Sequence, residues 1–240
     1  MAEREKILIL GGTREAANLA AELVAAGHDV TTSLAGRTAE PEPVAGKTRI
    51  GGFSGNGRSG TEGLADWLTE NGFTRLIDAT HPFAKQISEN AEAAARLTGI
   101  AFEHHTRKPW QQQPGDTWIE VASLEEARDA IPANARVLLA LGSQHITPFA
   151  TRPDVHFVIR MVDPPAIPLP FASHELVLGK PSSMVAEEKA LLQRHGITHI
   201  VCRNSGGEGA YAKIEAARQL HLPVIIVRSD GTAANEERMP

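Results

Sequence analysis

At 240 residues, the chain is long enough for one large α/β domain or two small ones. Its net charge of −5 argues against binding to nucleic acid or to an anionic membrane, because proteins of those classes normally present a basic surface. The single cysteine, Cys202, excludes an internal disulfide framework and is typical of a reducing compartment. Together with a charged start and no long apolar run, these features predict a soluble, cytoplasmic protein without a membrane span.

Short β-branched or leucine-rich runs alternate with alanine-rich amphipathic stretches in the first half of the chain. The pattern predicts strands at residues 6–10, 29–36, 47–53, 75–80 and 100–105, and helices at 14–26, 61–70 and 83–99. Pro82 is expected in the first turn of the last of these helices, where proline is tolerated.

The second half repeats the alternation less regularly. We expect strands at 117–123, 136–142, 155–162, 175–180, 197–204 and 223–228, helices at 124–131, 183–196 and 210–221, and an ordered proline-rich loop at 163–170. Strands that alternate with helices predict right-handed βαβ units and a mainly parallel sheet.

Glutamines, prolines and a glycine interrupt the pattern in "RKPWQQQPGD", which begins at Arg107. The predicted fold is therefore α/β with two Rossmann-like lobes, an N-terminal lobe at 1–109 and a C-terminal lobe at 110–230. Residues 231–240 lack apolar periodicity and are expected to form a frayed tail. The active site is expected in the cleft between the two lobes.

The stretch "GGTREA" lies where the first strand should turn into the first helix. Gly11 and Gly12 would let the backbone approach an anion, and Thr13 suits either a helix N-cap or a phosphate ligand. Arg14 opposes the helix dipole there, a conflict that a bound anion would remove and that Glu15 reduces. Neither the dinucleotide fingerprint nor a P-loop is present. A simple tight turn is the alternative.

The second strand ends without the acid that usually binds the ribose of NAD. Arg37 and Thr38 follow it instead, and an arginine at that place suits a 2′-phosphate. The residues thus favour NADP(H) over NAD(H), with an exposed loop arginine as the alternative.

The next junction between strand and helix, "DATHPFA", should project from the same sheet edge as the glycine loop. Ala79 and Thr80 are expected on the cofactor side, while Asp78 is expected to be structural. His81 suits a proton donor or a hydrogen-bond donor to the substrate, and a packing role at the helix entry is the alternative.

A second glycine-rich junction, "RNSGG", occurs in the C-terminal half. Its polar and glycine residues predict a second anion site, which we expect to bind the cofactor, with Lys213 in the following helix; they are Asn204, Ser205, Gly206 and Gly207. Cys202 lies in an apolar strand and is expected in the core. The histidines lack metal-ligand spacing, so no metal site is predicted. The Tyr-x-x-x-Lys pair of short-chain dehydrogenases is absent as well.

In order along the chain, "GGTREA", "SLAGRT", "DATHPFA", "RKPW" and the late "NSGG…AKIEAARQLHLPVIIV" resemble the precorrin-6A reductase family, which includes the cobalt-precorrin-6A enzymes. The resemblance spans nearly the whole chain. Arg203 departs from it, because members often carry lysine before Asn-Ser-Gly, and so does "RSDG" near the end, where Arg-Pro is more usual. The resemblance implies two Rossmann-like lobes and NADPH-dependent reduction of one double bond of precorrin-6A, giving precorrin-6B in cobalamin biosynthesis.

For this reaction the nicotinamide supplies the hydride, and His81 is the expected proton donor. The tetrapyrrole carries many carboxylates, which should be bound by cations near loop ends: Lys85, Arg107, Lys108, Arg160, Lys180, Arg203 and Lys213. Neighbouring pathway enzymes are possible partners, and nucleic acid and membranes are not expected. Another NADP-dependent oxidoreductase of this fold and a non-catalytic NADP sensor are the alternatives.

Overall fold

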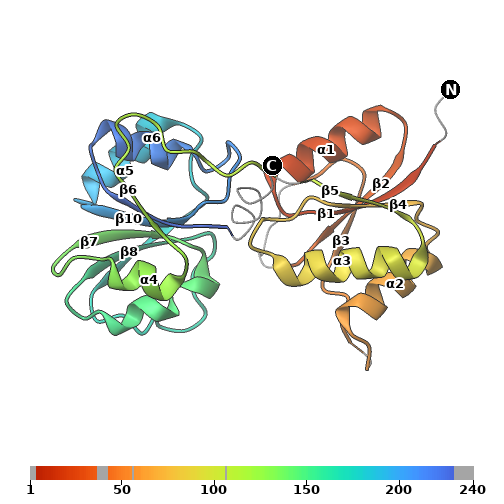
Figure 1. Cartoon of the computed structure of the whole chain (residues 1–240), viewed down its shortest axis with the longest axis horizontal. Coiled ribbons are helices and arrows are strands. Elements are labelled where there is room, and N and C mark those ends of the chain that lie inside the picture. Colours follow the sequence, from red (N-terminus) through yellow and green to blue (C-terminus); the bar gives the residue numbers. More distant parts are fainter. Residues whose placement is uncertain (1–3, 37–42, 56, 106, 230–240) are drawn as a thin grey trace, which may run out of the picture. The chain divides into compact units, whose positions relative to one another are not determined.

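The computed structural model describes residues 4–36, 43–55, 57–105 and 107–229 (Figure 1). The chain divides into two compact units, Met1–Arg107 and Lys108–Pro240. The division falls two residues before the predicted boundary. The predicted tail at 231–240 lies outside the described residues.

The first unit contains a parallel sheet of 5 strands in the order β3-β2-β1-β4-β5. Its elements are β1 (Lys6–Leu10), α1 (Arg14–Ala25), β2 (Asp29–Leu34), β3 (Lys47–Ile50), α2 (Gly60–Glu70), β4 (Arg75–Asp78), α3 (Lys85–Thr98) and β5 (Ala101–His104). Helix α1 covers one face of this sheet, and α2 and α3 cover the other (Figure 1).

Alternation along β1 explains the two layers. Ile7 and Ile9 pack on one face with the alanines of α1, while Leu8 and Leu10 pack on the other with Leu64 of α2. These four side chains of β1 are all buried, as expected for a central strand with helices on both faces.

The second unit contains a parallel sheet of 6 strands in the order β6-β11-β10-β7-β8-β9. Its elements are β6 (Trp118–Val121), α4 (Leu124–Asp129), β7 (Arg136–Ala140), η1 (Ser143–His145), η2 (Thr147–Thr151), β8 (His156–Met161), β9 (His174–Leu178), α5 (Val185–Arg194), β10 (His199–Arg203), α6 (Ala212–Gln219) and β11 (Val224–Val227). Helices α5 and α6 pack together over one face, and α4 lies over the other (Figure 1).

These observations confirm the predicted α/β class and the parallel sheets. One local prediction needs correction. Pro82 is not in the first helical turn, because α3 begins only at Lys85. Instead, the Ala84 amide donates to the His81 carbonyl at 2.7 Å, so Pro82 takes the second position of a β-turn, which suits its fixed φ. The short 3-10 helices η1 and η2 were not predicted, since they follow no strong apolar period.

Among the helices of the described residues, none combines the length and the apolar character needed to cross a membrane.

Candidate functional site

Each sheet has one place where the chain reverses the direction in which it adds strands. In the first unit this switch lies between β1 and β4, and in the second it lies between β7 and β10. Because all strands within each sheet are parallel, the loops after these strands emerge at the same edge of that sheet. Open α/β sheets bind ligands in the crevice formed there.

The glycine loop after β1 approaches β2 closely. The Gly11 amide donates to the Ser33 carbonyl at 2.9 Å, and a Cβ atom at Gly11 would lie 2.6 Å from Cγ2 of Thr32. Gly12 has a φ of +104°, which residues other than glycine rarely adopt. Within the described residues, the amides of Gly12 and Thr13 donate to no carbonyl, so both are available to an anion at the start of α1.

Thr13 ties this loop to the junction after β4. Its hydroxyl accepts a hydrogen bond from the Ala16 amide at 3.0 Å, which confirms the N-cap prediction. The same hydroxyl donates to the carbonyl of Ala79, also at 3.0 Å. Arg14 is exposed in the first turn of α1. The two predicted cofactor loops of the first unit are therefore physically joined through Thr13.

Glu15 and Arg107 form an ion pair. Nη2 of Arg107 lies 2.5 Å from Oε2 of Glu15. The Arg107 side chain is only 13% exposed, and that of Glu15 is 25% exposed. Burial lowers the pKa of Arg107, and the Glu15 carboxylate opposes that shift. The residues were expected to contact different ligands, but in the structure each has the other as its partner. The pair also neutralises an acidic charge near the glycine loop, where it would repel a phosphate.

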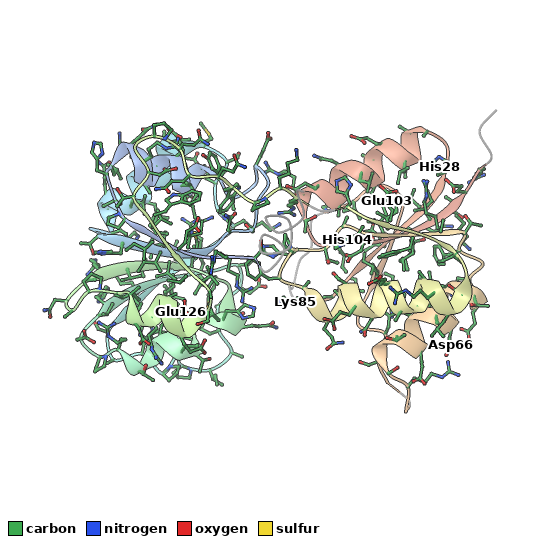
Figure 2. All side chains as sticks on the ribbon, viewed as in Figure 1. His28, Asp66, Lys85, Glu103, His104 and Glu126 are labelled. Carbon is green, nitrogen blue, oxygen red and sulfur yellow. The ribbon has the colours of Figure 1, made fainter. Side chains whose placement is uncertain are left out.

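Asp78 organises the junction after β4. It is fully buried, and Oδ1 accepts hydrogen bonds from the Thr80 amide at 3.0 Å and from the Thr80 hydroxyl at 2.7 Å. Its Oδ2 lies 3.5 Å from Nε2 of His104 at the end of β5 (Figure 2). This arrangement agrees with the structural role expected for Asp78, which fixes Thr80 beside His81.

His81 is half-buried, and its Nδ1 accepts a hydrogen bond from the Phe83 amide at 3.3 Å. In the neutral ring, this contact places the proton on Nε2. Lys85 is exposed in the first turn of α3 (Figure 2).

The loop after β10 resembles the first glycine loop in position but is shaped differently. Gly206 and Gly207 have φ values of +61° and +71°, and their amides donate to no carbonyl in the described part of the chain. Arg203, at the end of β10, is half-buried, and burial lowers its pKa. Ser205 is buried beside it. Asn204 is also buried, but its amide group is hydrogen-bonded to the backbone of Trp110.

The predicted substrate cations of the second unit occupy contrasting positions. Arg160 and Lys213 are buried, and Nη2 of Arg160 donates to Oε2 of Glu188 at 2.9 Å. Burial lowers the pKa of Lys213. Lys180 is exposed after β9, the strand of this sheet farthest from the switch on that side. Arg160 therefore pairs inside its unit rather than presenting a surface charge.

Several further predictions can be placed. Cys202 is buried and burial raises its pKa, which confirms the core assignment. Arg37 and Thr38 lie outside the described residues. No group of three or more His, Cys, Asp or Glu side chains suited to a metal ion occurs among the residues that the structure describes.

One candidate loop was missed. Residues 141–145 follow β7, on the other side of the switch from β10, and Gly142 has a φ of +76°. Its position becomes informative only when the strand order is known. The sequence "LGSQH" alone carries no distinctive motif.

Comparisons with known proteins identify the family. A family model described as precorrin-6x reductase CbiJ/CobK matches residues 6–239. The chain belongs to this family. It is 44% identical to the precorrin-6A reductase of Rhodobacter capsulatus over 232 residues, covering 96% of this chain and 90% of that protein. It is 45% identical over 227 residues to the precorrin-6A reductase of a Sinorhizobium species, covering 94% and 85%.

A solved structure described as CobK precorrin-6A reductase matches with a TM-score of 0.88 and 46% sequence identity, covering 93% of this chain and 87% of that one. The match confirms the predicted α/β fold and the family resemblance. Membership of the precorrin-6x reductase family also makes the chain an enzyme, which removes the non-catalytic sensor from the alternatives.

The Glu15–Arg107 pair yields a stability prediction for this precorrin-6x reductase. In a double-mutant cycle with Glu15→Gln and Arg107→Met, we expect a favourable coupling of about 1 kcal/mol, because both side chains are mostly shielded from water. The free energies of unfolding are measured by urea denaturation.

The matched control is the pair Glu92 and Arg96, which is spaced i,i+4 on α3 and is far more exposed. We expect less than half the coupling there, because solvent screens an exposed pair. A coupling for Glu15 and Arg107 no larger than that of the control would contradict the structural role assigned to the pair.

Proposed function

We propose that this chain is a precorrin-6A reductase that uses NADPH to reduce one double bond of the macrocycle and forms precorrin-6B in cobalamin biosynthesis. The observation that carries the proposal is the match over nearly the whole chain to proteins named precorrin-6A reductase, with identities of 44% and 45%. A match in both units, rather than in one nucleotide-binding half, supports a shared substrate as well as a shared fold.

The first glycine loop is the proposed phosphate side of the cofactor site. Its residues Gly11, Gly12, Thr13, Arg14 and Glu15 lie at the switch between β1 and β4, together with Ala79 and Thr80 after β4. The Gly12 and Thr13 amides donate to no carbonyl of the described residues and suit a phosphate, and Thr13 holds the loop against Ala79. Asn204, Ser205, Gly206 and Gly207 form a second proposed anion-binding loop in the other unit.

Arg37 is the proposed reader of the 2′-phosphate, because it follows β2 in the sequence. A second arginine, Arg49, is paired with Ser33 of β2 in the sheet, but its guanidinium already has partners within the protein. Its guanidinium donates to the carbonyls of Gly51 at 2.5 Å and Gly52 at 2.6 Å and lies 3.9 Å from the centre of the Phe53 ring. The case for Arg37 rests on its place after β2 in the sequence.

The reduction requires a hydride and a proton. When bound, the nicotinamide supplies the hydride, and the conjugated macrocycle accepts it. His81 is the proposed proton donor, because an imidazolium can give up a proton near neutral pH and the residue lies in the loop after β4, beside the switch. The protein otherwise aligns the two reactants.

The substrate carboxylates are proposed to pair with Lys85, Arg107, Arg160, Lys180, Arg203 and Lys213. The structure distinguishes among these cations: Lys85 and Lys180 are exposed, Arg203 is half-buried, and Arg107 and Arg160 already have carboxylate partners. Arg203 has the strongest case by position alone, because it lies at the end of β10, a strand beside the switch. A cytoplasmic location and contacts with neighbouring pathway enzymes remain predictions from the sequence.

The cofactor assignment is tested with Arg37→Ala. We expect KM for NADPH to rise at least tenfold while KM for NADH changes less than twofold, because only NADPH carries the 2′-phosphate that the arginine would pair with. Turnover with precorrin-6A is followed under anaerobic conditions through the nicotinamide and tetrapyrrole absorbance bands. Equal losses with both cofactors would contradict the role of Arg37, and no spectral change with the wild-type protein would contradict the reductase assignment.

The proton-donor assignment is tested with His81→Gln. Loss of a general acid should lower kcat about 100-fold or more while KM for NADPH stays within about twofold. The control is His28→Gln, since His28 precedes β2 at the opposite edge of the sheet and accepts a hydrogen bond from the Glu5 amide (Figure 2). Wild-type kcat in the His81 variant would remove this residue as the acid.

A further inference from the structure

Trp110 makes an unusual set of contacts with the second glycine loop. Its amide donates to Oδ1 of Asn204 at 2.7 Å, and its carbonyl accepts from Nδ2 of Asn204 at 2.9 Å. Its indole Nε1 donates to the carbonyl of Gly207 at 2.7 Å. One residue at the start of the second unit therefore contacts this loop at two points, Asn204 and Gly207.

These contacts are shielded from solvent. Trp110 is 9% exposed and Asn204 is 7% exposed, and the backbone N–H of Asn204 also donates to the Val227 carbonyl of β11 at 2.8 Å. Buried hydrogen bonds are costly to break, because the groups left behind cannot turn to water. The loop is thus fixed at its first residue by β11 and Trp110, and three residues later by the indole.

The two glycines of this loop need such support. Gly206 and Gly207 both have positive φ, and they carry no side chains that could hold the conformation. At the far end of the loop, Nζ of Lys213 donates to the carbonyl of Ala210 at 2.7 Å and lies 4.7 Å from the centre of the Trp110 ring. Trp110 and Lys213 therefore donate hydrogen bonds to the carbonyls of Gly207 and Ala210. The Gly206 and Gly207 amides have no carbonyl partner among the described residues.

We propose that Trp110 is a positioning residue of the reductase, which holds the Gly206 and Gly207 amides in the arrangement that binds an anionic group of a ligand. Asn204 then serves as the clamp for Trp110 and does not itself contact the ligand. The anion is a phosphate of the cofactor or a carboxylate of the substrate, which share the same hydrogen-bonding chemistry. This inference rests on the proposed function, since both anions belong to its reactants.

The test uses Trp110→Phe, which keeps an aromatic ring but removes the indole N–H that Gly207 accepts. We expect KM for one of the two reactants to rise about fivefold to tenfold, in line with one lost buried hydrogen bond, while kcat changes less than twofold. The reactant whose KM rises identifies the source of the anion. KM values are measured separately for NADPH and for precorrin-6A.

Trp118→Phe is the matched control. Nε1 of Trp118 is buried in the second unit without a hydrogen-bond partner among the described residues, so this variant loses an indole N–H but no hydrogen bond. We expect wild-type kinetics from it. If Trp110→Phe merely lowers the melting temperature and leaves both KM values at the level of this control, Trp110 is structural only and the inference is overturned.

A second measurement does not depend on the folding of the Trp110 variant. The chain has 3 tryptophans, whose indole N–H groups give separate signals in a ¹H–¹⁵N NMR spectrum. The Trp67→Phe and Trp118→Phe variants assign the Trp110 signal by elimination. NADP⁺ or precorrin-6A, added separately to the wild-type protein, should shift the Trp110 signal and leave that of Trp118 in place.

If neither ligand moves the Trp110 signal, the inference is overturned. The proposed function is judged separately, by turnover of NADPH and precorrin-6A with the wild-type enzyme. Turnover without any effect at Trp110 contradicts only the positioning role, whereas absent turnover contradicts the proposed function itself.

Discussion

Parallel strand pairing is the constraint on which the candidate site depends. In each sheet, every strand runs in the same direction, so each loop that follows a strand emerges at the carboxyl edge of that sheet. The switches between β1 and β4 and between β7 and β10 then select which loops lie beside a crevice. The glycine loops after β1 and β10 both satisfy this condition. A glycine turn elsewhere in the chain would not have the same significance.

A second constraint acts within the loops, because much of their polar chemistry is used to shape them. Thr13 caps α1 and bonds to Ala79, Glu15 pairs with Arg107, and Asn204 pairs with Trp110. These side chains hold backbone amides in position rather than presenting their own polar groups. Backbone amides then become the groups best placed for an anion, which is consistent with the proposed binding of a cofactor phosphate without the usual dinucleotide fingerprint.

The fold was largely predictable from local pattern. The continuous apolar run of β1 is typical of a central strand buried on both faces, and the apolar spacing of α1 places Ala16 and Ala20 against that strand. Both signals lie within a few neighbouring residues. Pro82 was misplaced because proline suits a β-turn as well as a first helical turn, and the choice depends on where α3 begins.

The site was less predictable because its pairings join distant positions. Asn204 and Trp110 are 94 residues apart in the sequence. No local rule indicates that the side-chain amide of Asn204 will bond to the backbone of Trp110. The ion pair of Arg107 with Glu15 is another such pairing, because the two residues are far apart in the sequence. Residue type and motif indicated the right loops, but only the folded chain shows which side chains are already committed.

The central claim is that hydride passes from NADPH to the precorrin-6A macrocycle on this protein. It is tested most directly with NADPH that carries deuterium in place of both hydrogens at C4 of the nicotinamide, in ordinary water, followed by mass spectrometry of the tetrapyrrole product. We predict that the product carries one deuterium atom in place of one hydrogen of the product formed with unlabelled NADPH, and is heavier by that difference. A reduced product of identical mass with both cofactors would contradict it.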